Sequence, residues 1–298
     1  MNRNALLAFV TVFVVFGLGI LAYADRARLV VLDPAGPIAY GEKAVIITTL
    51  ALCAVIVVPV FVMLFVFAWT YRASNPKSAC SHHAEWDHFS GVSEFLWWIP
   101  PMIIIFILGI LAWKSSHALD PYIPLPGQSM EVDVVALDWK WLFIYPREGI
   151  ASVNMLEIPE DTPVHFYLTA DAPMNSFWVP SLGGQIMVMP GMTTQLNLEA
   201  DRVGAFNGLS GNISGEGFAG MNFTVESVPQ TDFNSWVQAI KQTNMPLTAD
   251  SYAALAAPSS YNAVTYYSSV DPHLYIGISM RYMSAPIPMQ GSMSGMQM

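Results

Sequence analysis

Residues 44–69 read AVIITTLALCAVIVVPVFVMLFVFAW and contain no charged residue. A helix of about 20 residues crosses about 30 Å of hydrocarbon, so this run is long enough to span a membrane. Trp69 ends the run, where an amphipathic ring prefers the membrane interface, and Pro59 should kink the helix. We therefore predict a transmembrane helix over about residues 44–70.

Two further apolar runs flank this one. Residues 95–113 hold no charge and predict a second transmembrane helix. Residues 5–24 follow Arg3 and end in Ala22-Tyr23-Ala24, a layout typical of a cleaved signal peptide or of an uncleaved anchor helix. Both interpretations stay open for residues 1–24.

The distribution of Lys and Arg does not decide the orientation, because they occur both between the two predicted helices and before them. The signal-like start does decide it. It places residues 25–43 on the extracytoplasmic side, the 71–94 loop in the cytoplasm, and everything after Lys114 on the extracytoplasmic side.

Composition sets limits on the class of protein. Only 11% of the 298 residues are charged, against about 25% in a typical soluble protein. The net charge of −10, with 12 Lys and Arg in all, leaves no basic face for nucleic acid. The two cysteines, Cys53 and Cys80, lie in or next to the membrane part, which excludes a disulfide or thiolate metal site in the rest of the chain. No local hydrolase motif is present either.

From Met130 onward, short alternating runs separated by Pro and Gly replace the long apolar ones. This pattern predicts an all-β sandwich. The clearest strands are expected at Met130–Leu137, Val164–Thr169, Thr193–Leu198 and Met221–Val228.

After Asp232 the apolar spacing becomes helical, with Phe233, Trp236, Val237 and Ile240 on one face and Thr231 or Asp232 as the expected N-cap. We therefore divide the chain into a first segment, a helical hairpin, the sandwich, a helical C-terminal extension and a disordered Met-rich tail. The expected boundaries are 1–24, 25–115, 116–230, 231–284 and 285–298.

Three motifs narrow the fold further: DWKWLFIYP at residues 138–146, MNSFWVPSLG at 174–183 and GLSGNISGEGFAGM at 208–221. Together with two preceding helices they resemble subunit II of haem-copper oxidases over about residues 30–285. The third motif resembles the copper loop of that family, Gly-x-Cys-x-Glu-x-Cys-Gly-x-x-His-x-x-Met. The resemblance implies a membrane-anchored, cupredoxin-like sandwich.

The departures from the family pattern fall on the ligands of its dinuclear copper-A centre. That centre needs two bridging thiolates, two imidazoles, a thioether and a carbonyl, and hard serine hydroxyls cannot bridge copper ions. By the resemblance, only the thioether ligand, Met221, is retained in this sequence. We therefore expect the chain to keep the fold of the family and to lack the copper-A centre. The vestigial positions are Asn175, Ser210, Asn212, Ser214, Phe218 and Met221.

The branch of the family without this copper is the cytochrome bo-type ubiquinol oxidase, which the chain resembles throughout. The resemblance implies a non-catalytic subunit II of a proton-pumping ubiquinol oxidase. Such a subunit lies in the bacterial inner membrane with its C-terminal domain in the periplasm and binds no cofactor. Haems and the remaining copper are expected in subunit I, and ubiquinol is the substrate of the complex.

The implied partners are subunits I, III and IV and membrane lipid, without nucleic acid or cytochrome c. Two other functions stay as alternatives: a membrane-tethered copper-handling or binding protein, and a copper-A subunit that accepts electrons in a cytochrome c oxidase.

Four other features have a functional and a simpler interpretation. Glu94 matches a family proton-entry carboxylate, and it also suits a helix N-terminus. Cys80-x-His82-His83-x4-His88 could bind zinc, but a solvated loop is favoured because the spacing is loose. For Trp139 and Trp141 we favour packing. The five tail methionines could bind Cu(I), but a flexible tail is favoured; they are Met283, Met289, Met293, Met296 and Met298.

Overall fold

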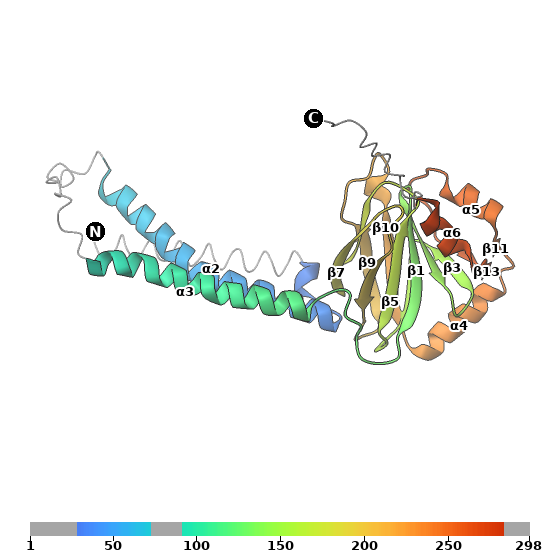
Figure 1. Ribbon diagram of the computed structural model, residues 1–298, viewed down its shortest axis with the longest axis horizontal. Coiled ribbons are helices and arrows are strands. Elements are labelled where there is room, and N and C mark those ends of the chain that lie inside the picture. Colours follow the sequence, from blue (N-terminus) through green and yellow to red (C-terminus); the bar gives the residue numbers. More distant parts are fainter. Residues whose placement is uncertain (1–28, 73–90, 283–298) are drawn as a thin grey trace, which may run out of the picture. The chain divides into compact units, whose positions relative to one another are not determined.

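The computed structural model describes residues 29–72 and 91–282, which divide into two compact units (Figure 1). The first, the membrane unit, includes Tyr40–Asp120 and with them all but the first three residues of the two long helices. The second, the sandwich unit, begins at Pro121 and also includes Pro34–Ala39. The first apolar run, the Cys80–His88 cluster and the residues from 283 onward lie outside the described residues.

Helices α2 (Pro37–Thr70) and α3 (Gly91–Ala118) contain the predicted membrane spans. Both are longer than predicted, because absence of charge locates only the apolar middle of a helix. Most of their described apolar side chains are exposed, for example Leu50 at 64% and Phe106 at 70%, while Ile38 and Ala39 at the start of α2 are buried. A helix that is apolar all round and not covered by protein suits a lipid environment.

The sandwich unit contains two main sheets. The six-stranded sheet has the order β12-β3-β2-β1-β5-β8, and the five-stranded sheet has the order β4-β10-β9-β6-β7. The four predicted strands are confirmed as β1 (Met130–Leu137), β5 (Val164–Ala170), β8 (Thr194–Leu198) and β10 (Asn222–Val228). The others are β2 (Lys140–Tyr145), β3 (Ile150–Val153), β4 (Met155–Pro159), β6 (Asn175–Val179), β7 (Gly183–Val188), β9 (Gly204–Ser210) and β12 (Thr265–Tyr267).

Aromatic rings fill the space between the two sheets. Trp141 of β2 meets Phe177 of β6 edge-on with ring centroids 5.4 Å apart, and Phe177 stacks on Phe223 of β10 at 5.1 Å. All three side chains are buried. Aromatic pairs in such geometries add about 0.5–1.5 kcal/mol beyond the area they bury, so this cluster fixes how the sheets face each other.

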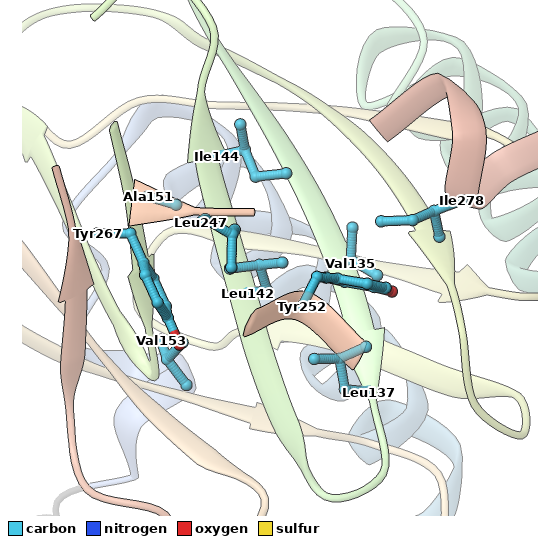
Figure 2. Packing of buried hydrophobic residues seen from close by; sticks show 10 residues of the cluster. All are labelled: Val135, Leu137, Leu142, Ile144, Ala151, Val153, Leu247, Tyr252, Tyr267 and Ile278. Carbon is cyan, nitrogen blue, oxygen red and sulfur yellow. The ribbon is translucent and has the colours of Figure 1, made fainter. Parts of the chain in front are cut away.

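The opposite face of the six-stranded sheet is covered by the C-terminal extension (Figure 2). Leu142 and Ile144 alternate with Trp141 and Phe143 along β2, so they point away from the aromatic core. They pack with Leu247, Tyr252, Tyr267 and Ile278 of the extension. Burial on both faces explains why residues 140–145 carry no polar alternation.

The extension was predicted as helical, and it contains strands as well. Helices α4 (Gln230–Lys241), α5 (Ala249–Ala256) and α6 (Leu274–Arg281) alternate with short strands β11 (Pro246–Leu247), β12 and β13 (Ser269–Val270). Strand β12 pairs antiparallel with β3 and enlarges the sheet. Two- and three-residue strands leave no periodic signal, so only the pairing reveals them.

The N-cap predicted for α4 is wrong. The cap is Pro229, without a side-chain hydrogen bond, and the helix begins at Gln230. Asp232 lies in the first turn, where the helix dipole favours a carboxylate. The predicted apolar face is confirmed, since Phe233, Val237 and Ile240 are buried.

Residues 34–39, which include the first turn of α2, are part of the sandwich unit. The backbone of Ala35 accepts a hydrogen bond from Asp201 N (3.0 Å) and donates one to Ser181 O (2.7 Å). Gly36 lies so close to the sandwich that a Cβ there would stand 2.1 Å from the carbonyl oxygen of Glu199. Residues 34–39 therefore form a clip that only glycine permits at position 36.

Candidate functional site

Asn175 and Ser210, two of the positions predicted to be vestigial copper ligands, lie on neighbouring strands of the five-stranded sheet. Asn175 begins β6, and Ser210 ends β9, which pairs with β6 in the register Phe177↔Ser210. The chain then runs through residues 211–221, including the short helix η4 (Phe218–Gly220), into β10. We call residues 210–221 the vestigial loop. Strand pairing thus brings together residues from two distant motifs.

Ser210 and Asn175 form the buried centre of this site, exposed by 3% and 1%. The Ser210 hydroxyl donates to Asn175 Oδ1 at 3.1 Å, with the Asn212 carbonyl oxygen also within 3.3 Å. It accepts a hydrogen bond from the backbone N–H of Ser176 at 3.4 Å. Asn175 Nδ2 donates to the Pro173 carbonyl at 2.8 Å. Both side chains are engaged by their own neighbours.

The rest of the vestigial loop is held by backbone contacts and packing. Met221 is buried, and its carbonyl accepts the N–H of Ser210 at 3.3 Å. Asn212 Nδ2 donates to the Met174 carbonyl at 2.8 Å. Ser214 and Phe218 are half-buried, and the Ser214 hydroxyl has no hydrogen-bond partner within the described part of the chain. Hydrogen bonds therefore link Ser210 to Asn175, Asn212 and Met221, whose side chains carry amide and thioether groups.

Two aromatic side chains lie against the vestigial loop from outside its sheet. Trp139 of the β1–β2 turn has a positive φ of 63°, and its indole N–H donates to the Ser214 carbonyl at 3.4 Å. A Cβ on Gly217 would stand 2.3 Å from the Trp139 ring. Tyr261 of the extension lies over Gly220 in the same way, at 2.9 Å. The packing interpretation of Trp139 is confirmed, whereas Tyr261 gave no sequence signal because its contact is 41 positions away along the printed sequence.

Histidines do not complete a metal site here. His165 Nδ1 lies 2.5 Å from Asn197 Oδ1 between β5 and β8, and His273 precedes α6. Across residues 29–72 and 91–282, no three His, Cys, Asp or Glu side chains are grouped as metal ligands would be. The donor set of the vestigial loop does not fit a dinuclear copper centre, which needs soft bridging thiolates.

Glu94 lies in the first turn of α3, and it is exposed. It belongs to the membrane unit, and the vestigial loop belongs to the sandwich unit. The structure therefore gives two separate candidate sites.

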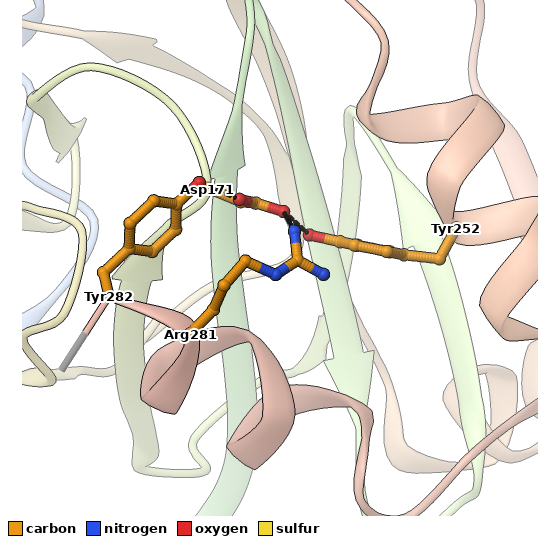
Figure 3. Close-up of polar contacts among 4 residues, drawn as sticks. All are labelled: Asp171, Tyr252, Arg281 and Tyr282. Carbon is orange, nitrogen blue, oxygen red and sulfur yellow. Dashed lines mark hydrogen bonds and ion pairs between the residues drawn. The ribbon is translucent and has the colours of Figure 1, made fainter. Parts of the chain in front are cut away.

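A polar cluster that sequence reasoning missed joins the extension to the sandwich (Figure 3). Asp171, which follows β5, accepts hydrogen bonds from Tyr252 of α5 (2.6 Å), Arg281 of α6 (2.7 Å) and Tyr282 (2.5 Å). The Asp171 side chain is only 4% exposed. Burial and the hydrogen bond to Asp171 raise the pKa of Tyr252. A single buried carboxylate thus joins α5 in the middle of the extension to the end of α6.

Another buried carboxylate lies between β4 and β10. Glu157 is 5% exposed and stands beside Glu226 in the parallel register of these strands. Burial, together with repulsion from Glu226 and Asp232, raises the pKa of Glu157 to about 7. Its protonation therefore changes near neutral pH.

Family models match both parts of the sandwich unit. Residues 132–228 match the cytochrome c oxidase subunit II periplasmic domain, and residues 241–285 match the COX aromatic rich motif. Two apolar helices followed by this domain define a membrane-anchored oxidase subunit of the subunit II type. It is an inner-membrane protein with its C-terminal domain in the periplasm.

Similar proteins identify the branch. The chain is 46% identical to the cytochrome bo(3) ubiquinol oxidase subunit 2 of Pseudomonas putida, over 84% of this chain and 80% of that protein. It is 42% identical to the ubiquinol oxidase subunit 2 of Acetobacter aceti, over 86% and 83%. It is 37% identical to the quinol oxidase subunit 2 of Bacillus cereus, over 82% and 86%. The chain belongs to the ubiquinol oxidase subunit 2 family.

Proposed function

We propose that this chain is the non-catalytic subunit II of a proton-pumping ubiquinol oxidase, with a structural and assembly role and without a copper-A centre. The observation that carries the proposal is Ser210. It stands at a bridging-thiolate position, and its hydroxyl is engaged by Asn175 and Ser176 within a buried hydrogen-bond network. Such a network suits a fold that no longer transfers electrons. The similar proteins are named ubiquinol oxidase or quinol oxidase subunit 2, which supports the assignment to a quinol oxidase.

The proposal assigns the chemistry to partner subunits. Ubiquinol is oxidised by the complex, and haems and copper are carried by subunit I, while this chain binds no cofactor. Subunits I, III and IV and membrane lipid are its partners, and cytochrome c is not. The exposed apolar surfaces of α2 and α3 support contact with lipid or with apolar subunits.

The proposal also gives Glu94 a role in proton entry to subunit I. An exposed carboxylate at the cytoplasmic end of a membrane helix can exchange protons with water and pass them to a neighbouring pathway. Its place in the first turn of α3 adds a stabilising interaction with the helix dipole.

The experiment is gentle purification of the native complex through a tag on this chain. Haem spectrum, copper content, and oxygen uptake with ubiquinol and with reduced cytochrome c are then measured. We expect b/o-type haems, one copper, and oxygen uptake with ubiquinol alone. Three coppers with cytochrome c activity would show that the copper-A alternative is correct. A preparation without haem would instead favour the tethered copper-handling alternative.

A further inference from the structure

Two carboxylates of the six-stranded sheet lie near helix α6, in different settings. Asp171 is bound to the C-terminal end of α6 by hydrogen bonds (Figure 3). Asp133 of β1 points to the same side of the sheet as Val135, because side chains two positions apart in a strand share a face. Val135 belongs to one hydrophobic cluster with Ile278 of α6 (Figure 2). Asp133 therefore lies on the face of the sheet that the extension covers.

A cavity lies between this part of the sheet and the start of α6. Its volume is about 110 Å³, and its lining includes Asp133 and Ile144 from the sheet and Tyr275 from α6. Val270 and Asp271, from the segment that leads into α6, complete the same wall. Asp133 is half-buried in this arrangement. Docking of α6 on the sheet thus withdraws the Asp133 carboxylate from part of its surrounding water.

The described residues supply no partner that would compensate the charge of Asp133. No hydrogen-bond donor among residues 29–72 and 91–282 reaches its carboxylate. The titratable groups on the elements around it are Glu131, Arg147, His165, Tyr167, Asp271 and Tyr275. The nearby cations have other partners: Arg147 lies 3.9 Å from Glu131, Lys140 donates to the Ala257 carbonyl, and Arg281 binds Asp171.

A carboxylate that is withdrawn from water without a partner is costly in its charged form. Burial, with a smaller contribution from the charge of Glu131, therefore raises the pKa of Asp133 from the ordinary 3.8 to about 7. The effect is reciprocal, because lifting α6 would return Asp133 to water and restore its ordinary pKa. The docked helix and the proton on Asp133 thus stabilise each other.

We propose that Asp133 is a pH-sensitive switch for α6: the helix docks on the sheet while Asp133 is protonated and opens more often once Asp133 is ionised. Asp171 holds the C-terminal end of α6 in both states, so the opening concerns the end that carries Tyr275. The switch responds to the pH of the periplasm, where the sandwich unit lies. It goes beyond the function proposed above and does not depend on quinol oxidation.

The direction of the response follows from the two protonation equilibria. Between pH 3.8 and about 7, docked α6 retains the proton and open α6 releases it, so docking weakens as pH rises through this window. Above about pH 7 both states are ionised, and docking no longer changes with the charge of Asp133. Each pH unit inside the window changes the docking equilibrium by at most about tenfold.

The test is hydrogen exchange of the α6 amides in the whole purified complex between pH 5 and pH 8. Asp133→Asn keeps the shape of the protonated carboxyl and cannot ionise. Asp250→Asn is the matched control, because Asp250 is an exposed carboxylate of α5 in the same extension. Rates are compared between proteins at equal pH, which removes the intrinsic pH dependence of exchange. The α4 amides, which lie beside Glu157 and not Asp133, serve as an internal reference.

We expect α6 exchange in the wild type, relative to Asp133→Asn, to become about tenfold faster from pH 5 to pH 8, because Asp133 keeps part of its water contact. Asp250→Asn should follow the wild type, and the α4 amides should respond equally in all three proteins. Asp133→Ala, a second neutral variant, should lack the wild-type response as Asp133→Asn does. Equal ubiquinol-dependent oxygen uptake shows that the complexes are intact.

Two results would overturn the proposal. The first is a constant ratio of α6 exchange between the wild type and Asp133→Asn across the pH range. The second is loss of the response in Asp250→Asn as well, since the effect would then belong to the total charge of the extension and not to Asp133.

Discussion

The hydroxyl of Ser210 lies 3.1 Å from Oδ1 of Asn175, although 35 positions separate the two residues in sequence. By the family resemblance these are positions of a bridging thiolate and an imidazole. A hydroxyl can accept one hydrogen bond and donate another, so here it joins Ser176 and Asn175 instead of bridging metal ions. Ser210 thus forms a small buried polar network between β6 and β9.

Replacing Ser210 by alanine should therefore affect stability and not electron transfer. The Ser176 N–H and the Asn175 amide oxygen would lose a buried partner, at a cost of about 1–3 kcal/mol. Thermal unfolding of the purified complex, followed by tryptophan fluorescence, should begin at a lower temperature. Oxygen uptake with ubiquinol per complex should stay at the wild-type level.

The control for this prediction is Ser235→Ala on the exposed face of α4, where the hydroxyl bonds only a carbonyl of its own helix. It should change stability by less than about 0.5 kcal/mol. A Ser210→Ala complex that melts like this control would contradict the structural role of the network.

Replacing Gly36 by alanine should detach the clip of residues 34–39. The new Cβ would clash with the backbone oxygen of Glu199, which cannot rotate away as a side chain could. Overpacking of this kind costs about 1–3 kcal/mol, and we expect a lower thermal midpoint and less subunit in the membrane. Gly277→Ala is the matched control, because nothing lies within 4 Å of its Cβ position and alanine favours a helix. Equal thermal midpoints and equal subunit amounts in the two variants would show that close packing of residues 34–39 on the sandwich does not contribute to stability.

Replacing Asp171 by alanine should loosen the extension. The Tyr252 hydroxyl would lose its hydrogen-bond acceptor, and Arg281 would lose its counter-charge. Because Arg281 is half-exposed, we expect the free energy of unfolding to fall by about 2 kcal/mol, less than for a fully buried pair. Hydrogen exchange of α6 amides in the assembled complex should become faster. Glu131→Ala breaks only the exposed contact with Arg147 at 3.9 Å and should leave α6 exchange unchanged. If the α6 amides of the Asp171 variant exchange as slowly as in the wild type, the Asp171 cluster does not hold the extension on the sandwich.

The raised pKa of Glu157 gives stability a definite pH dependence. Between the ordinary value of 4.5 and about 7, the folded chain binds this proton and the unfolded chain does not. The free energy of unfolding should therefore fall as pH rises through this window, by at most about 3 kcal/mol from this group. Glu157→Gln should lose this component, so its thermal midpoint relative to wild type should rise between pH 5 and pH 8. A constant difference across that range would show that Glu157 titrates normally.

Replacing Glu94 by glutamine tests the proton-entry proposal. Ubiquinol-dependent turnover of the assembled oxidase should slow severalfold, while the amount of this subunit in the complex stays the same. If Glu94 serves only the helix dipole, the change costs about 0.3–1 kcal/mol of stability and leaves turnover intact. Glu216→Gln, in the exposed part of the vestigial loop, provides the control and should not alter turnover.

The sequence by itself determined the elements whose signal is local. A charge-free run of about twenty residues requires a membrane or a large core whatever lies around it, and this identified α2 and α3. Alternation identified β1 and β5 in the same way. Serine at a thiolate position excludes bridged copper by its chemistry alone, so Ser210 and Ser214 pointed to the copper-free branch before any contact was known.

Only the tertiary structure decided the relationships that cross the chain. Strand order put Asn175 beside Ser210, and pairing with β3 turned residues 265–267 into a strand of the main sheet. The three donors on Asp171 come from α5, from α6 and from the residue after α6, at 81 or more positions away. Such contacts depend on which surfaces the folded sheets leave open. No local pattern of residues encodes that choice, because it is made by burial of the whole apolar surface at once.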